Sequence, residues 1–388
     1  MATDRTVNSF FAGIGGFDLG FEEAEFRTLA QSEVDPGCLG VLRRHWPFAA
    51  RAGDVAAVDP ASLPEAGVWC AGFPCQDVSL ARAGSRDGLR GARTGLFFAF
   101  AELVGARRPP AVVLENVPGL LSSNAGADFR TVLEALSGHG YSVAWRTLNS
   151  RWFGVPQSRP RVFLVASPDP AAAAAALFEP TPPARVSERD GALREPDSAS
   201  GVTVPRVSFC LAATSGRHTG TDWSRTYVVD AGRARRMTPE ECEAVQGFPE
   251  GWTSSGAGPA EDAARYRMCG NAVSVPVARW LASMLLAPAP PDLGAHGFGP
   301  ASPQPGASFA KWPRAGLWGA GRLRTAPGCP SAPSAPVPSR LLDCVRGGAD
   351  GRFFISANAA AGILRRAGSM GRRLFPPLRE ALARLVPG

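Results

Sequence analysis

Residues 6–17 read TVNSFFAGIGGF, and this stretch decides the class of fold. The apolar run over 6–11 predicts a β-strand, and a helical pattern over 17–25 follows it, with glycines 13, 15 and 16 between them. Glycine permits a sharp turn and close approach of a ligand, and the helix start offers free N–H groups. A strand, a glycine turn and a helix in this order predict an α/β fold with a ligand at its first turn, although a purely structural turn is the alternative.

The same alternation of short apolar runs and helical patterns continues to residue 166, which is typical of an α/β sheet. The further strands are expected at 28–33, 67–71, 111–115, 141–148 and 161–166, and the further helices at 36–45, 96–107 and 129–137. The glycine turn lacks the full GxGxxG pattern of dinucleotide enzymes, and no Walker lysine follows it, which argues against ATP hydrolysis.

Two acids sharpen the prediction for the glycine turn. Glu33 ends the second expected strand, where an acid can bind ribose hydroxyls. Asp54 lies near the next strand and could accept a hydrogen bond from an adenine amino group. Two surface acids beside a structural turn are the alternative, but the three features together favour a cofactor that contains adenosine.

A thiol and a carboxyl also stand at strand ends. Cys75 lies in GFPCQ (72–76), just past the strand at 67–71, and Glu115 ends the strand at 111–115. Ligands of open α/β sheets bind at the carboxyl ends of the strands. A cysteine attacks as its thiolate, which nearby cations favour, and the loop after Cys75 carries four arginines. The pair predicts a nucleophile and a proton-handling carboxyl, against the alternative of a buried inert thiol.

Composition bounds the rest. The 388 residues are 45% hydrophobic and 19% charged, which is typical of a globular protein. The net charge of +7 suits a polyanionic partner, but Lys311 is the only lysine, and a GC-rich genome would give the same arginine bias. Eight cysteines without a CxxC pair and four histidines argue against a zinc site or a disulfide scaffold. The sequence shows neither the apolar core of a signal peptide nor a stretch of about 20 apolar residues that could span a membrane. We therefore expect a soluble, cytoplasmic monomer that binds no metal.

Composition along the chain predicts five segments. The expected segments are a catalytic and cofactor-binding domain over 1–167, a small, mostly β or irregular target-recognition region over 168–234, a return to the catalytic domain over 235–287, a disordered linker rich in proline, alanine and glycine over 288–340, and a small basic helical appendage over 341–388. The extension after 287 is therefore expected to be flexible.

Six short segments, in this order, resemble the cytosine-C5 DNA methyltransferase family, particularly its short phage and prophage members. The segments are FAGIGG (11–16), PCQ (74–76), ENV (115–117), QSRPR (157–161), RRMTPEEC (235–242) and GNAV (270–273). The resemblance covers roughly residues 6–286. It implies a Rossmann-like sheet that binds S-adenosylmethionine, and double-stranded DNA whose target cytosine is flipped into a pocket.

The resemblance also implies roles for single residues. Cys75 would add to C6 of cytosine, and Glu115 would bind N3 and the amino group and supply a proton. Arg161 would contact O2 of the base and Arg159 would support the cysteine and its loop, since alternation along a strand puts both arginines on one face. The residues expected to bind the cofactor are Phe11, Gly13, Gly15, Gly16, Glu33, Asp54, Pro74, Leu96, Asn271 and Val273.

The family reads its DNA sequence between the arginine pair and the TPEE segment, and this region is short here, which suggests a small target. Residues 214–225 are the candidate segment for base or phosphate contacts, with a solvated loop as the alternative. The candidate DNA contacts are Gln76, Ser79, Arg82, Arg93, Arg217, His218 and Arg225. Arginines after residue 364 could bind phosphates or form a solvated helix face.

Two other functions compete with DNA cytosine methylation. The tRNA branch of the family carries a Cys-Phe-Thr element in its reader region, whereas Cys210 here is followed by leucine and alanine. A DNA-binding module without activity is the third hypothesis, and the filled catalytic positions count against it. The target sequence, a cognate restriction endonuclease and the base that removes the C5 proton stay open.

Overall fold

The computed structural model describes residues 4–74, 95–183, 193–216, 224–304, 307 and 309–386. The chain divides into two compact units, and each unit is made of three separate segments of the chain. Unit 1 comprises Met1–Asn149, Pro160–Val186 and Val277–Ala335, and unit 2 comprises Ser150–Arg159, Ser187–Pro276 and Pro336–Gly388. Each unit is described by itself.

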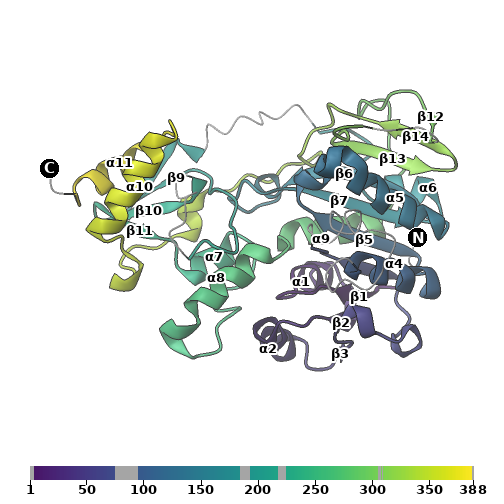
Figure 1. Ribbon diagram of the computed structural model, residues 1–388, viewed down its shortest axis with the longest axis horizontal. Helices are drawn as coiled ribbons and strands as arrows, with labels where there is room; N and C mark the ends of the chain where they lie inside the picture. The colour runs from purple at the N-terminus through teal and green to yellow at the C-terminus, as the bar shows by residue number, and fades with distance from the viewer. Residues whose placement is uncertain are drawn as a thin grey trace. The chain divides into compact units, whose positions relative to one another are not determined.

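Unit 1 is built on a ten-stranded sheet with the order β12-β14-β13-β6-β7-β5-β4-β1-β2-β3 (Figure 1). The strands from β5 to β3 in this order run parallel, whereas β7 is antiparallel to both β5 and β6. The strands of the first part of the chain are β1 (Thr6–Phe10), β2 (Arg27–Ser32), β3 (Ala50–Arg51), β4 (Val68–Ala71), β5 (Ala111–Asn116), β6 (Ser142–Asn149) and β7 (Pro160–Ser167). The predicted α/β sheet is confirmed, and the parallel strands bring their carboxyl ends to one edge.

Helices lie between several of these strands, and the sequence predicted those at 17–25, 36–45, 96–107 and 129–137. They are α1 (Gly16–Glu22), α2 (Pro36–His45), α4 (Leu96–Arg107), α5 (Ala127–Gly138), α6 (Pro170–Ala175) and α9 (Val275–Leu286). Helix α2 starts where it does because the Asp35 carboxylate accepts from the N–H groups of Gly37 and Cys38 and Pro36 fills the first turn. Aromatic rings form much of the core, and Phe10 lies 4.8 Å from Trp69 and 5.1 Å from Phe100 between ring centroids.

The prediction of a disordered linker over 288–340 is wrong. This segment forms β12 (Ser302–Pro303), β13 (Ala315–Gly319) and β14 (Arg322–Thr325), and β13 pairs antiparallel with β6. Trp312 is 1% exposed, and its indole N–H donates to the carbonyl of Gly126 at 2.8 Å. A few buried aromatic side chains and a free sheet edge therefore order a stretch whose average composition resembles that of disordered chains.

Unit 2 holds a four-stranded antiparallel sheet with the order β11-β10-β9-β8. Its strands are β8 (Pro196–Ala199), β9 (Val202–Pro205), β10 (Tyr227–Asp230) and β11 (Arg233–Arg236), and its helices are α7 (Pro239–Ala244), α8 (Asp262–Asn271), α10 (Ala357–Ser369) and α11 (Pro376–Ala383). Short 3₁₀ turns occur in both units, at Val55–Ala57, Pro60–Ser62, Pro118–Leu121, Ser123–Gly126, Ser150–Trp152, Gly258–Glu261, Leu341–Cys344 and Gly351–Phe353.

Both faces of this small sheet are covered. Val228 belongs to an apolar cluster with Cys242 and Leu341, whereas its neighbours Tyr227 and Val229 pack with α10 and α11. The extension predicted to be flexible is thus part of the core of unit 2, because the alternation of side chains along β10 leaves an apolar face against which α10 and α11 pack.

No helix in the described part of the chain is long and apolar enough to span a membrane. Within the same residues, no cluster of three or more His, Cys, Asp or Glu side chains could hold a metal ion.

Candidate active site

The glycine turn between β1 and α1 has a left-handed main chain that suits glycine. Gly13 has a φ of +57° and Gly15 a φ of +85°. A Cβ on Gly15 would stand 2.4 Å from the ring of Trp46, so this position must be glycine, whereas a Cβ on Gly13 would meet nothing within 4 Å. Gly16 begins α1 behind the turn. The turn is therefore packed tightly on one side and open at Gly13.

Glu33 lies directly after β2 and fastens this turn. Its Oε2 accepts from the N–H of Gly13 at 2.8 Å, and its Oε1 accepts from the N–H groups of Val34 and Asp35 at 2.7 and 2.8 Å. An ionised carboxylate offers about four acceptor positions, so three are occupied and one remains. The side chain is half-buried, and it can hold the turn and still accept from one hydroxyl donor.

Asp54 lies just after β3, the strand that pairs parallel with β2. It therefore stands at the same edge of the sheet as Glu33. It is exposed, and one carboxylate oxygen accepts from the N–H of Ala56 at 3.0 Å. Phe11 and Leu96 are half-buried and pack on the same apolar core. Glu33 is thus bonded to the glycine turn, and Asp54, Phe11 and Leu96 lie in the same unit.

Glu115 and Arg161 form an ion pair at this edge. The two residues lie on β5 and β7, where Glu115 stands opposite Phe163 in the antiparallel register. Nε of Arg161 lies 2.9 Å from Oε1 of Glu115, and the side chains are 14% and 12% exposed, respectively. A carboxyl at a strand end is thus held by a cation and still reachable from solvent.

Asn116 fixes the chain on its way to Cys75, a role that the sequence analysis missed. Its Nδ2 donates to the carbonyl of Phe73 at 2.9 Å, and its Oδ1 accepts from the N–H of Val117 at 2.8 Å. Pro74, which is exposed, is the last described residue before Cys75. The sequence did contain a signal for this role. Asn116 directly follows Glu115 at the end of β5, and an amide in that place can bond to the segment after the neighbouring strand.

The prediction that Arg159 shares a strand face with Arg161 is wrong. Strand β7 begins at Pro160, so alternation does not extend to Arg159. Arg159 belongs to unit 2, is 2% exposed, and donates to the carbonyls of Leu211, Gly270 and Ala272 at 3.0, 3.1 and 2.7 Å. Its guanidinium therefore ties Leu211 to the end of α8, where Asn271 and Val273 lie in unit 2.

Several predicted site residues lie outside the described residues. They are Cys75, Gln76, Ser79, Arg82, Arg93, Arg217 and His218. Among the described cysteines, burial raises the pKa of the Cys70, Cys242 and Cys269 thiols well above the ordinary value, so these three are poor nucleophiles.

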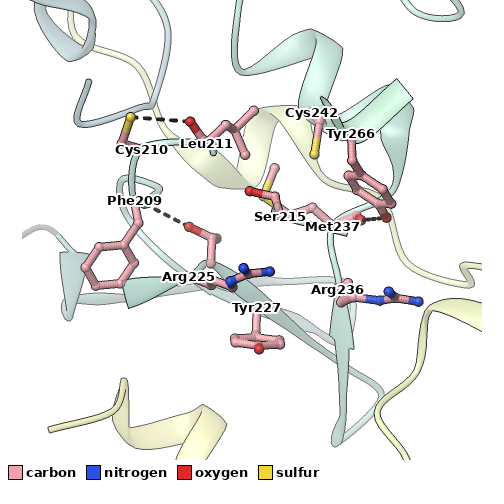
Figure 2. A pocket seen from close by; sticks show the side chains of 11 residues that line it. Phe209, Cys210, Leu211, Ser215, Arg225, Tyr227, Arg236, Met237, Cys242 and Tyr266 are labelled. Atoms are coloured by element: carbon pink, nitrogen blue, oxygen red, sulfur yellow. Dashed lines mark hydrogen bonds between the residues drawn. The ribbon is translucent and has the colours of Figure 1, made fainter. Parts of the chain in front are cut away.

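The described ends of the 214–225 segment are held close together. Arg225 donates to the carbonyl of Thr214, and Arg236 donates to the carbonyl of Gly216. Figure 2 shows Arg225 and Arg236 beside a pocket of unit 2 that Cys210, Met237 and Tyr266 also line. The cavity measures about 20 Å³, which leaves room for about one water molecule among the residues that the structure describes.

Comparisons with known proteins place this geometry in a family. The family model of the C-5 cytosine-specific DNA methylase matches residues 6–190 and 199–287. The Type II methyltransferase M2.BsuMI of Bacillus subtilis is 33% identical over 308 residues, which are 73% of this chain and 75% of the relative. The Type II methyltransferase M.NlaX of Neisseria lactamica is 31% identical over 72% of this chain and 96% of the relative.

The fold has solved counterparts as well. The structure of the Entamoeba histolytica methyltransferase EhMeth superposes with a TM-score of 0.51 at 16% identity, over 72% of this chain and 97% of that one. This likeness concerns the fold, whereas the family model and the sequence relatives carry the assignment. The protein belongs to the C-5 cytosine-specific DNA methylase family.

Proposed function

We propose that this protein transfers a methyl group from S-adenosylmethionine to C5 of a cytosine flipped out of a specific duplex DNA site, through a temporary bond between Cys75 and C6. The observation that carries this proposal is the shared edge of the sheet. Glu115, Glu33 and the glycine turn lie at the carboxyl ends of three parallel strands, and Asn116 ties the residue two positions before Cys75 to the same edge.

The residues at this edge fit S-adenosylmethionine. Glu33 keeps one acceptor position for a ribose hydroxyl, Asp54 is exposed and can accept from the adenine amino group, and Gly13 leaves its side of the turn open. Phe11 offers a ring for stacking and Leu96 packs on the same core, whereas Pro74, which follows β4, stays a prediction. When bound, the cofactor supplies a methyl group on a sulfonium. Asn271 and Val273 lie in unit 2 and stay predictions.

The chemistry asks two things of the protein. Carbon 5 of cytosine is a poor nucleophile until a group adds at C6, so the Cys75 thiolate forms a bond to C6 and the ring electrons move toward N3. Glu115, held by Arg161 at 2.9 Å, supplies a proton at N3 and stabilises the charge that develops there. After C5 has gained the methyl group, a base removes the C5 proton, and the C6–sulfur bond breaks to release the thiolate.

The DNA must present its base to this edge. A cytosine stacked in a duplex does not expose C6 to a thiol, so the base has to leave the stack. We assign Arg161 to the neighbourhood of O2, because it stands beside Glu115 on the adjoining strand. Residues 214–225 remain our candidates for sequence reading, and Arg159 binds the carbonyl of Leu211, three residues before that segment, within unit 2.

The covalent step can be tested with a trapping substrate. In duplex DNA that carries 5-fluorocytosine, C5 has no proton to lose after methylation, so the bond between sulfur and C6 should persist. We expect wild-type protein to form a complex with this DNA that survives denaturing electrophoresis, and Cys75→Ser to form none while it still binds the cofactor.

A matched variant and two substrates complete the test. Cys344→Ser removes a half-buried thiol of unit 2 and should trap DNA as wild type does. Labelled methyl groups should enter ordinary duplex DNA and not tRNA. Methyl transfer by Cys75→Ser would refute the covalent route, and label in tRNA alone would overturn DNA as the substrate.

A further inference from the structure

Helices α10 and α11 lie beyond the part of the chain that the family model matches, which ends at residue 287. Figure 1 shows them in yellow beside β10 and β11 of unit 2. Ile363 of α10 and Leu378 and Leu382 of α11 pack with Tyr227 and Val229 of β10. The two helices are therefore fixed to the sheet that follows the 214–225 reader segment, and they would move with it as one body.

The outer surface of this helical hairpin is basic. Between Ser356 and Val386 the chain carries six arginines and one acid, Glu380. The arginines are Arg365, Arg366, Arg372, Arg373, Arg379 and Arg384, and all except the half-buried Arg366 are exposed. Such an excess of one charge repels itself unless a partner of opposite charge binds there.

Other arginines of unit 2 are already paired. Arg340 contacts Asp197 at 2.7 Å, and Arg352 contacts Asp262 at 2.9 Å. In contrast, Arg365, Arg373, Arg379 and Arg384 pair with no carboxylate among the residues that the structure describes. Their charges are therefore available to an external anion.

Three arginines of the hairpin surround a hollow. A cavity of about 540 Å³ lies between the end of α10 and the start of α11, with Arg372, Arg373 and Arg379 around it. Leu364, Ala367, Leu374 and Pro376 supply apolar surface in the same cavity. Cationic side chains around an apolar surface suit a sugar–phosphate chain, whose phosphates are charged and whose sugars are partly apolar.

We propose that the α10–α11 hairpin binds the phosphate backbone of duplex DNA beside the target site, an inference that rests on the proposed function. Phosphate contacts fix the register and orientation of a protein on DNA without reading its sequence. Because the hairpin is packed on β10 and β11, its grip on the backbone holds the reader segment in register. The extension thus adds a second DNA contact to a short reader region.

The test compares two triple variants of the full-length protein. Arg372→Gln, Arg373→Gln and Arg379→Gln together remove the charges around the cavity. Arg27→Gln, Arg108→Gln and Arg322→Gln remove the same charge from exposed positions of unit 1. Binding to a duplex with long flanks is measured over a range of salt concentrations, and methyl transfer is measured in parallel.

We expect the hairpin variant to bind the long duplex about tenfold or more weakly, and its plot of log affinity against log salt to be shallower by about 3. The unit 1 variant should keep the wild-type slope, and lysine at positions 372, 373 and 379 should restore it. An unchanged slope in the hairpin variant, or an equal loss in both variants, would overturn the proposal. If the wild-type protein methylates no DNA at all, the proposed function fails instead, and that result is read from the parallel assay.

Discussion

Two arginine–carboxylate contacts, one in each unit, differ in how deeply they are buried. Arg235 in unit 2 is fully buried, and all five of its N–H donors have acceptors, which are Asp230, both oxygens of Glu241 and the carbonyls of Arg236 and Arg346. Arg161 and Glu115 in unit 1 instead lie at an edge that solvent reaches, with side chains that are 14% and 12% exposed.

The Glu241 carboxylate is as fully occupied as its partner. Besides Arg235, its oxygens accept from the N–H groups of Thr238 and Arg346 at 2.9 and 3.2 Å. A saturated, buried pair can bind nothing further and serves the fold, whereas a less enclosed pair at a strand end can exchange one contact for a substrate atom. The difference separates a structural carboxylate from the one that we propose to be catalytic, without reference to sequence relatives.

Replacing Glu115 should give the largest effect on activity. Glu115→Gln keeps the shape of the side chain but removes the proton that N3 needs, so methyl transfer should fall by about 10²- to 10⁴-fold. Because the pair with Arg161 is partly open to solvent, the free energy of unfolding should change by about 1 kcal/mol or less. Labelled methyl transfer and urea unfolding of the same preparation measure the two quantities. Full activity in this variant would remove Glu115 from the mechanism.

Replacing Glu241 should show the opposite pattern. Glu241→Gln leaves Arg235 with a buried charge that Asp230 alone must balance, and this should lower the free energy of unfolding by about 3 kcal/mol. Methyl transfer by the fraction that remains folded should stay near the wild-type rate. If Glu241→Gln folds as stably as wild type but has lost methyl transfer, then Glu241 is not a structural carboxylate and the contrast with Glu115 is wrong.

The edge that carries Glu115 was largely predictable from sequence. The six predicted strands between 6 and 166 lie within one residue of their predicted ends, because short apolar runs bounded by turns mark buried strands directly, whereas the two-residue strand β3 was not predicted. The positions of Glu33 and Glu115 at strand ends follow from the same pattern. Local sequence shows where a side chain stands along a strand, and the parallel arrangement brings strand ends together.

Contacts between distant segments were not predictable. The partners of Arg159 are carbonyls at 211, 270 and 272, and no pattern around 159 indicates them. Trp312 and Trp318 stand in a stretch dominated by proline, alanine and glycine, yet both are at most 4% exposed. Composition averages over such a stretch, whereas its order depends on a few aromatic side chains and on the edge of β6, whose need for a partner the sequence does not show.

A third carboxyl, Asp18 in α1, gives the smallest and most specific test of the same comparison. It is completely buried, and its Oδ1 accepts from the neutral amide of Gln31 at 2.7 Å instead of from a cation. Burial, against the effect of that hydrogen bond, raises the pKa of Asp18 to about 6 from an ordinary value of 3.8. The fold is therefore more stable when this carboxyl is protonated.

The sign of the pH effect follows from that direction. The stability contributed by protonated Asp18 is fully present below the unfolded pKa of 3.8 and is lost as the pH rises through about 6. Asp18→Asn keeps an acceptor for Gln31 and has no proton to lose, so between pH 4 and pH 8 its unfolding free energy should gain about 1–3 kcal/mol relative to wild type. Urea unfolding of both proteins at several pH values measures this change, and other titrating groups cancel in the difference. A difference that stays constant with pH would mean that Asp18 has the same pKa in the folded and unfolded states and keeps its charge in the fold. The amide of Gln31 would then stabilise a buried carboxylate as well as Arg235 stabilises Glu241.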